Sequence, residues 1–427
     1  MTFALALGLA IATFAAPTVR FSPQPRNPSS YVPGVAFDRI FQVWLENADY
    51  DATADDKNMR WIAENGILLT NYYAVTHPSQ PNYIATVGGE TFGLQNNDDQ
   101  SIPANVSTVV DLLETKGISW AEYQEDIPHP GYAGPADRPY VRKHNPLVSF
   151  DSITKNSSRR SQIKSLSDFD RDLSDDSLPQ WAFVTPNVLN DGHDTGLAHG
   201  ARWLRGWLEP LLRDDRFTKR TLVMVSFDEN KTYGKRNRVF TVLLGGAVPR
   251  SLRGTKDGMY FNHYSPLSTV SLNWDLPSLG RWDCAANAFS LVAHRAGYEN
   301  TDVKSYEGLW WNASYPGPLN EEETTAGWWP RPLTEAKCVS GRGVLPSVVE
   351  AWGRSRGSYN YTSVYPYDDS FHATRGGVSA VGVNDRSVNA SESPLPTPAA
   401  SSAMGRTRYP RLTVFSIIGI FLAWVLV

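Results

Sequence analysis

Residues 221–230 read TLVMVSFDEN, a continuous apolar run that stops abruptly at two acids. A second run, RIFQVWL at residues 39–45, stops in the same way at Glu46 and Asn47. Short apolar runs of this kind are typical of strands that are buried on both faces, as in parallel sheets. The two segments therefore predict the central strands of an α/β fold.

Other strand and helix patterns alternate along the chain. Strands are predicted at residues 67–73, 118–123, 181–185 and 238–244, and helices at residues 57–65, 109–116 and 198–212. Gly66 and Gly117 mark the ends of two of these helices, since glycine is favoured just after the last helical turn. The alternation predicts a mostly parallel central sheet with helices on both faces.

Acidic side chains directly follow the two central strands. Glu46 follows the first run, and Asp228 and Glu229 follow the second. Ligands bind at the carboxyl ends of strands in open α/β sheets, so these carboxylates are expected at one site. Because like charges in one cleft repel, a divalent cation with hard oxygen ligands would stabilise them, with Asn47 as a neutral ligand. The alternative is that each acid caps the helix that follows its strand.

Residues 76–89, THPSQPNYIATVGG, place a hydroxyl group just before a predicted helix. Ser79 precedes Pro81 by two residues, and proline is favoured at the first helical position. The Ser79 hydroxyl is therefore expected at a helix N-terminus, where free N–H groups and the helix dipole attract phosphate. A nucleophile there would have its anionic product stabilised as it forms. A plain N-cap role for Ser79 is the alternative, and the two roles are compatible.

A polar loop at residues 190–196, NDGHDTG, follows another predicted strand and should lie at the same sheet edge. It presents three ionisable side chains: Asp191, His193 and Asp194. His193 is expected to bind a phosphate oxygen, to ligate a metal or to protonate a leaving alkoxide, with a structural role as the alternative. His77 and His263 are further candidates for the same work.

Both ends of the chain carry targeting patterns. Residues 1–16, MTFALALGLAIATFAA, form an apolar run that is typical of a secretory signal, with a buried N-terminal strand or helix as the alternative. Residues 412–427 are apolar and uncharged, and they follow small residues at 399–403 and a polar spacer. This order is typical of a glycosylphosphatidylinositol (GPI) attachment signal, with a short tail-anchored transmembrane helix as the alternative.

These signals predict a secreted protein held at the cell surface by a GPI lipid, on the plasma membrane or the cell wall. Four parts follow: a signal peptide at residues 1–16, a catalytic domain at 17–375, a Ser/Pro-rich stalk at 376–402 and the attachment signal at 403–427. The formal net charge is −4 and no long basic run occurs, so nucleic acid is not an expected partner. No protein partner is predicted either.

Six Asn-x-Ser/Thr sequons are consistent with the predicted secretion, because glycosylation requires the secretory route. They lie at Asn105, Asn156, Asn230, Asn312, Asn360 and Asn389. The sequon at Asn230 adjoins the predicted carboxylate site, so we expect that it is unmodified or points away from the site. The two cysteines, Cys284 and Cys338, are expected to form one disulfide in an oxidising compartment.

Four segments between about Phe37 and Asp275 carry a resemblance to a known family. They are WLEN at 44–47, followed by Tyr50 and Asp51, HPSQPNY at 77–83, NDGHD at 190–194 and FDEN at 227–230. Together they resemble the phosphoesterase family that holds fungal secreted acid phosphatases and bacterial phospholipases C, within the alkaline-phosphatase-like superfamily. The resemblance implies an alkaline-phosphatase-like fold and hydrolysis of phosphate esters.

The resemblance also implies roles for individual residues. Glu46, Asn47, Asp228 and Glu229 match the family's metal-site residues. The multiple histidine ligands of two-zinc phosphatases are absent at FDEN, so one divalent metal ion of unknown identity is expected. The SQPNY segment looks like the nucleophile segment of nucleotide pyrophosphatases, with Ser79 in the place of their threonine. The other expected site residues are Asp194 beside His193 in catalysis, and His77, Asn82 and His263 in substrate binding.

The predicted activity is that of a secreted acid phosphatase acting on small phosphomonoesters. Ser79 would attack phosphorus in line while the bound cation neutralises the phosphoryl oxygens, and a phosphoserine would form. His193 would protonate the leaving oxygen, and water would then release phosphate. A phospholipase C-type phosphodiesterase, which the anchor would bring near a membrane, is one alternative, and a non-catalytic GPI-anchored cell-wall protein is another.

Overall fold

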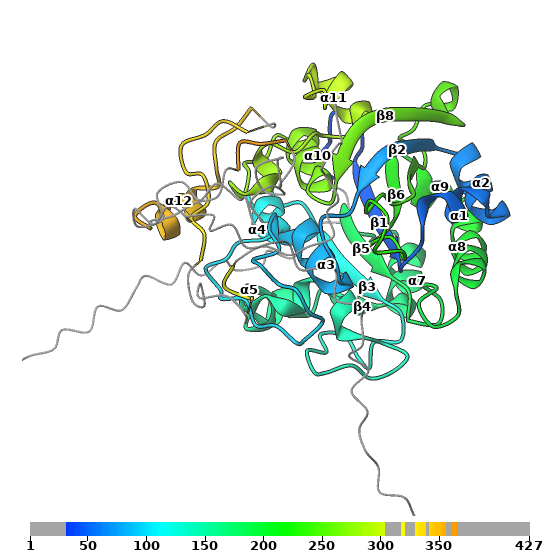
Figure 1. Cartoon of the computed structure of the whole chain (residues 1–427), viewed down its shortest axis with the longest axis horizontal. Coiled ribbons are helices and arrows are strands. Elements are labelled where there is room, and N and C mark those ends of the chain that lie inside the picture. Colours follow the sequence, from blue (N-terminus) through cyan, green and yellow to red (C-terminus); the bar gives the residue numbers. More distant parts are fainter. Residues whose placement is uncertain (1–30, 304–316, 321–328, 339–340, 356–360, 365–427) are drawn as a thin grey trace, which may run out of the picture. The chain divides into compact units, whose positions relative to one another are not determined.

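An eight-stranded sheet forms the centre of the computed structural model (Figure 1). Its strands are β1 (Arg39–Leu45), β2 (Ile67–Tyr73), β3 (Trp120–Gln124), β4 (Ile163–Ser165), β5 (Trp181–Thr185), β6 (Thr221–Phe227), β7 (Thr241–Leu244) and β8 (Thr255–Asn262). Their order across the sheet is β4, β3, β5, β1, β6, β7, β2, β8. Only the pairs that β7 makes with β6 and β2 are antiparallel among the described strands, which confirms the mostly parallel sheet.

The structure describes residues 31–303, 317–320, 329–338, 341–355 and 361–364. The expected signal peptide at 1–16, the stalk at 376–402 and the attachment signal at 403–427 lie outside the described residues. The sequons at Asn312, Asn360 and Asn389 also lie outside them. Within the described ranges, no helix has the length and apolar character that a membrane span requires.

The central strands β1 and β6 position the chain segments that follow them at the carboxyl edge of the sheet. Every residue of β1 and of β6 is buried, as their continuous apolar character predicts. The parallel register places Leu45 beside Phe227, the last residues of the two strands. The chain segments that begin at Glu46 and Asp228 therefore leave the sheet side by side.

Helices cover both faces of the sheet. The described helices are α1 (Tyr50–Asp55), α2 (Lys57–Glu64), α3 (Ser79–Gly88), α4 (Val109–Glu114), α5 (Asp151–Thr154), α6 (Ser157–Arg160), α7 (Leu166–Ser174), α8 (Leu197–Leu211), α9 (Asp215–Thr218), α10 (Ser265–Trp274), α11 (Ser290–Ala296) and α12 (Pro346–Trp352). Figure 1 shows α3, α4 and α10 on one side of the sheet and α2, α8 and α9 on the other. In α8, Leu204, Leu208 and Leu211 are buried, and this spacing forms one apolar stripe along the helix. The predicted α/β layering is confirmed.

Strands β1, β2, β5 and β6 have the predicted bounds, whereas β4 and β8 were missed. β4 has only three residues, which is too short for a periodic signal. β8 lies at the edge of the sheet, and its first half carries Lys256, Asp257 and Gly258. An edge strand tolerates polar residues because one side of it faces solvent, so its sequence lacks the apolar run of a central strand.

One disulfide joins Cys284, in the 3₁₀ turn Trp282–Cys284, to Cys338. The two cysteines are 54 residues apart in the sequence. The bond confirms the expected pairing, and it fixes the segment around Cys338 to the chain that follows α10.

Glu122, on β3, is a buried carboxyl group without an ion-pair partner in the described part of the chain. Its side chain is fully buried, and its Oε1 accepts a hydrogen bond of 3.2 Å from the backbone N–H of Leu147. Burial raises the pKa of Glu122 to about 8. The folded protein therefore holds a proton here at mildly acidic and neutral pH.

We predict that this proton makes the fold more stable in acid. Between pH 4.5 and about 8 the unfolded chain releases the Glu122 proton and the folded chain keeps it, so the free energy of unfolding falls as pH rises. One such group contributes a slope of up to about 1.4 kcal/mol per pH unit. Glu122→Gln, which is neutral at every pH, should flatten the slope in denaturant unfolding between pH 5 and 8. An unchanged slope in the variant would show that Glu122 is ionised in the folded state.

Candidate active site

Three carboxylates lie together where β1 and β6 end. Glu46, Asp228 and Glu229 are each no more than 2% exposed. The backbone holds their segments in place, since Asp228 N–H donates to Leu45 O at 3.1 Å and Ala48 N–H donates to Glu229 O at 3.3 Å. Burial raises the pKa of Asp228 well above its usual range, and the charges of Glu46 and Glu229 raise it further. The three carboxyl groups are therefore buried close together, and their proximity disfavours the ionised form of Asp228 unless positive charge is supplied.

Asn47 links the two strand ends. Its backbone has φ of 45°, a left-handed conformation that asparagine tolerates better than most residues. This turn lets the Asn47 N–H donate to Asp228 Oδ1 at 3.0 Å, while its Nδ2 donates to Glu46 Oε2 at 2.7 Å. Asn47 thus fixes the carboxylates of Glu46 and Asp228 relative to each other.

Ser79 is the first residue of α3. The N-cap of this helix is Pro78, and no side chain makes a capping hydrogen bond, so the Ser79 hydroxyl is not used as a cap. Its Oγ lies 3.5 Å from the Lys143 ammonium nitrogen. Burial raises the pKa of Glu229, and a hydrogen bond with Ser79 is among the contacts that oppose this shift. The hydroxyl therefore lies at a helix N-terminus and against the carboxylate cluster.

Two basic residues complete the cluster, and sequence reasoning selected neither. Lys143 and His144 lie in the 3₁₀ turn Arg142–His144, which packs against α3. Lys143 Nζ is 3.2 Å from Glu46 Oε1. His144 contacts Glu46 through Nε2 and lies 3.2 Å from Asp191 Oδ2 through Nδ1. The two side chains bring positive charge to a carboxylate that is 97 residues away from Lys143 in the sequence.

The ion pairs among Glu46, Lys143 and His144 shift the pKa values of all three side chains. Burial alone would lower the pKa of His144, but the charge of Glu46 outweighs it and raises the pKa to about 9. Burial would likewise lower the pKa of Lys143, yet the nearby carboxylates hold it above its usual range. Burial opposes ionisation of Glu46, but His144 and Lys143 bring its pKa well below the ordinary value. Glu46 is therefore ionised between two cations.

His77 contacts the carboxylate of Glu229 and the side chain of Asn230. Its Nδ1 is 2.7 Å from Glu229 Oε2, and its Nε2 is 3.1 Å from Asn230 Oδ1. Its ring lies against Tyr233, with the ring centroids 3.9 Å apart. The expected substrate-binding residue thus holds Glu229 in this structure.

The sequon at Asn230 lies in a closed place. Asn230 is 1% exposed, and its Nδ2 donates to Thr232 O at 2.8 Å. A glycan on this nitrogen would have no room in so buried a place, which is the physical reason to expect that Asn230 is unmodified. Asn105 and Asn156 are exposed.

Two further residues expected to bind substrate support the site from within the protein. His263 is fully buried, with Nε2 2.6 Å from the backbone O of Asp228 and Nδ1 3.2 Å from Tyr72 Oη. Burial lowers the pKa of His263 to about 3, so the ring is neutral. Asn82 is also fully buried; its Oδ1 accepts from the N–H groups of Val75 and Thr76, at 3.0 and 3.3 Å. The polar atoms of both side chains are therefore bonded to neighbouring groups of the protein next to the site.

The loop at residues 190–194 reaches the same edge. His193 is the more open of its two predicted catalytic residues, with 33% of its side chain exposed, and its Nδ1 is 2.7 Å from Asp194 Oδ1. Asp194 also forms an ion pair of 2.5 Å with Arg138. The hydrogen bond with His193 lowers the pKa of Asp194. His193 also contributes charge that lowers the pKa of Glu46, so this loop faces the cluster.

The donor set has the chemistry that a divalent cation requires. Asp228 Oδ2 is buried and has no hydrogen-bond partner among the described residues, and its neighbours are further hard oxygen donors. In the part of the chain that the structure describes, however, no three His, Cys, Asp or Glu side chains are already arranged around a point as metal ligands. Glu46 is instead held by Lys143 and His144. The oxygen donors fit a metal ion by type, with Asp228 as the side chain that most needs one.

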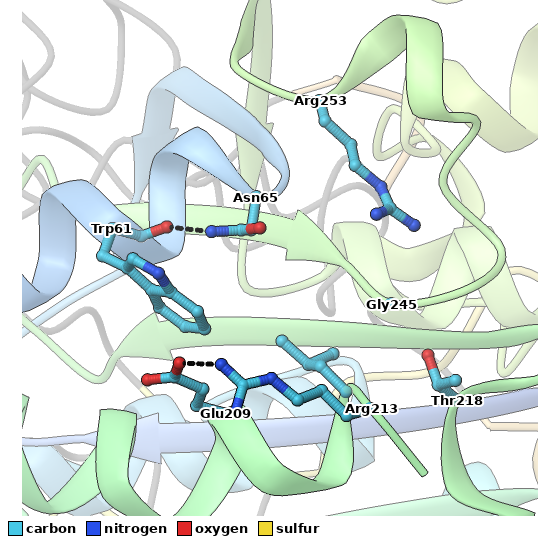
Figure 2. A pocket seen from close by; sticks show the side chains of 8 residues that line it. Trp61, Asn65, Glu209, Arg213, Thr218, Gly245 and Arg253 are labelled. Carbon is cyan, nitrogen blue, oxygen red and sulfur yellow. Dashed lines mark hydrogen bonds and ion pairs between the residues drawn. The ribbon is translucent and has the colours of Figure 1, made fainter. Parts of the chain in front are cut away.

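A cavity of about 300 Å³ lies at the opposite edge of the sheet (Figure 2). Its lining residues are Trp61, Asn65, Glu209, Leu212, Arg213, Thr218, Gly245 and Arg253. Asn65 precedes β2, and Gly245 follows the antiparallel strand β7, which places the cavity at the amino ends of the parallel strands. It contains none of the predicted site residues.

The sheet and the cluster define an α/β enzyme whose polar centre lies at the carboxyl edge of a parallel sheet. The chain belongs to the Phosphoesterase family, which it matches over residues 46–277. It is 53% identical over 356 residues to an acid phosphatase of Aspergillus fumigatus, an alignment that covers 81% of this chain and 79% of the relative. It is 48% identical over 354 residues to a phosphate-repressible acid phosphatase of Penicillium chrysogenum, covering 82% and 85%.

More distant relatives extend the comparison. A phosphatidylinositol-3-phosphatase of Mycobacterium tuberculosis is 31% identical over 283 residues, which cover 64% of this chain and 88% of that protein. Among solved structures, a protein in the alkaline phosphatase superfamily from Vibrio parahaemolyticus aligns with 59% of this chain and 71% of its own, at a TM-score of 0.39 and 11% identity.

The role of Asn82 gives a prediction about stability. Asn82→Ala would leave the buried N–H groups of Val75 and Thr76 without an acceptor, at a cost of about 1–3 kcal/mol in the free energy of unfolding. Asn82→Asp keeps the acceptor oxygen but loses the Nδ2 group that donates to Thr76 O and Pro78 O at 2.9 and 3.2 Å, so it should recover at most part of the lost stability. Urea unfolding of both variants measures the effect. If Asn82→Ala lowered only the affinity for substrate and left stability unchanged, Asn82 would be a substrate ligand instead.

Proposed function

We propose that this chain is an acid phosphatase, a phosphoric monoester hydrolase that uses Ser79 as its nucleophile. The observation that carries the proposal is the position of the Ser79 hydroxyl, at the N-terminus of α3, 3.5 Å from a lysine ammonium and against Glu229. Sequence identities of 48–53% with two acid phosphatases, over about four-fifths of the chain, support monoester hydrolysis.

The place of Ser79 suits attack on phosphorus. In the N-terminal turn of α3 the Gln80 N–H donates to Asn97 Oδ1 at 3.0 Å and Pro81 has no N–H, so the helix contributes mainly the positive end of its dipole, which stabilises the anionic phosphoryl group. Ser79 Oγ would form a bond to phosphorus while the bond to the leaving oxygen breaks, which gives a phosphoserine. Water would then attack the same phosphorus, release phosphate and restore the hydroxyl.

His193 is the proposed general acid. Its ring is partly exposed, so it can reach a substrate that enters from solvent, and Asp194 holds its Nδ1 at 2.7 Å. A carboxylate on one ring nitrogen fixes the orientation of the imidazole and leaves the other nitrogen to donate a proton. His193 would protonate the leaving oxygen as the phosphoserine forms.

One divalent metal ion is part of the proposal, with Glu46, Asn47, Asp228 and Glu229 as the residues that would hold it. The unpartnered Oδ2 of Asp228 and the repulsion among the buried carboxylates support it. When bound, such an ion would supply charge stabilisation for the phosphoryl oxygens.

The proposed localisation is the cell surface. The secretory signal at residues 1–16 and the GPI attachment signal at 403–427 support a secreted protein that a lipid anchors. An anchored phosphatase would act on small phosphomonoesters outside the cell. Membership of the Phosphoesterase family speaks against the non-catalytic alternative.

Ser79→Ala should lower the turnover rate for a simple phosphomonoester by on the order of 10³-fold or more, because the nucleophile is lost. Rapid quenching with radiolabelled substrate should trap phosphoenzyme in the wild type and none in the variant. Ser174→Ala, at an exposed serine that ends α7, is the matched control and should keep full activity. Wild-type activity in Ser79→Ala, with the fold intact by circular dichroism, would refute the nucleophile.

The same preparations separate monoesterase from diesterase function. We expect a simple phosphomonoester to be hydrolysed far faster than phosphatidylcholine. The reverse preference would identify a phospholipase C-type phosphodiesterase that uses the same site.

The metal site has its own test. Glu46→Gln combined with Asp228→Asn removes two charged oxygen ligands, so the purified variant should lose its bound metal, as measured by elemental mass spectrometry. Asp170→Asn, at an exposed acid of α7, is the control for a lost surface charge. A metal content equal to that of the wild type would contradict this ligand set.

A further inference from the structure

We propose that Lys143 is a catalytic residue whose ammonium group stabilises the Ser79 oxygen and binds a non-bridging oxygen of the phosphoryl group. The proposal deepens the function proposed above and rests on Ser79 as the nucleophile. It adds a cation that the protein itself supplies, in addition to any metal held by the carboxylates.

The contacts of Lys143 carry the proposal. Its Nζ lies 3.2 Å from Glu46 Oε1 and 3.5 Å from Ser79 Oγ, and only 16% of its side chain is exposed. An ammonium group has three N–H donors. Two are directed at Glu46 and Ser79, and no described residue accepts the third. A phosphoryl oxygen beside Ser79 would fill that position.

The three consecutive basic residues of the 3₁₀ turn have different partners. Arg142 anchors the turn, because its guanidinium donates to the carbonyls of Ala133, Gln100 and Val148 at 2.7, 3.2 and 3.1 Å. His144 is held by two carboxylates, one on each ring nitrogen. Lys143, between them, is the one that reaches the Ser79 hydroxyl.

The other basic side chains near the carboxylates contact other partners. His77 lies against Glu229 and Asn230, and His193 lies against Asp194. Lys143 is therefore the cation placed at the oxygen that reacts. A charge fixed there before the reaction costs no reorganisation when negative charge develops on phosphoryl oxygens.

The chemistry balances without a covalent role for Lys143. Ser79 Oγ gives up its proton to solvent water and forms the bond to phosphorus, while the electron pair of the broken bond goes to the leaving oxygen, which His193 protonates. When water later attacks the phosphoserine, the bonding electrons return to Ser79 Oγ, which takes up one proton of the attacking water, and His193 recovers its proton from solvent. In both steps Lys143, 3.5 Å from Ser79 Oγ, donates to the serine oxygen and to the phosphoryl group.

The test compares Lys143→Met, which removes the charge at similar length, with Lys143→Arg, which keeps it. We expect Lys143→Met to lower kcat/KM for a phosphomonoester by about 10²- to 10³-fold, the loss typical of one preorganised donor. Inhibition by inorganic phosphate should weaken by at least about tenfold, since one charged contact is lost. Lys143→Arg should recover part of both. Lys155→Met, at an exposed lysine that pairs with Asp151, is the matched control and should change neither.

Each other outcome has a definite meaning. If Lys143→Met lowered stability or metal content but left phosphate inhibition and kcat unchanged, Lys143 would only support Glu46 and the proposal would be wrong. Lys143→Gln provides a second neutral variant if the methionine variant does not fold. If Ser79→Ala is inactive and Lys143→Met is not impaired, this inference fails alone. If Ser79→Ala is active, the nucleophile assignment fails as well.

Discussion

The parallel pairing of β1 with β6 is the constraint on which the rest of the site depends. It aligns Leu45 with Phe227, so that the next residues of both strands leave the sheet at one point. The left-handed turn at Asn47 then joins the two ends through its hydrogen bonds to Asp228 and Glu46. A shift of the register by one residue would reverse the side chains of a whole strand and scatter the carboxylates.

Bringing carboxylates together in a buried place creates a need for positive charge. Removing an ion from water costs several kcal/mol, and like charges at short range add to that cost. The 3₁₀ turn at Arg142–His144 meets part of the need, because Lys143 and His144 both contact Glu46. Asp228 remains the least compensated of the carboxylates. The unpartnered carboxylate oxygen of Asp228 makes the site suitable for a cation, whereas the ammonium group of Lys143 makes the place beside Ser79 suitable for a phosphate.

The sequence singled out residues of the site without indicating which groups they contact. Glu46, Asp228 and Ser79 were selected because each follows or precedes an element with a clear pattern. Asn82 and His263 were expected to bind substrate, which stays a prediction; in the structure Asn82 Oδ1 accepts from backbone N–H groups, and the two nitrogens of His263 contact Asp228 O and Tyr72 Oη. Sequence cannot distinguish these roles, because a buried polar side chain that satisfies the backbone and one that faces a ligand have the same composition.

What the sequence by itself determined was local. Continuous apolar runs defined β1 and β6, acids at their ends defined the carboxylates, and Pro81 indicated the helix that begins near Ser79, because each signal lies within a few residues of the feature it predicts. The tertiary structure alone decided which distant groups meet. Lys143 and His144 occupy a short turn with no periodic pattern, and Glu46 is 97 residues from Lys143. Their approach depends on the packing of that turn against α3, which is set by the whole core and not by neighbouring residues.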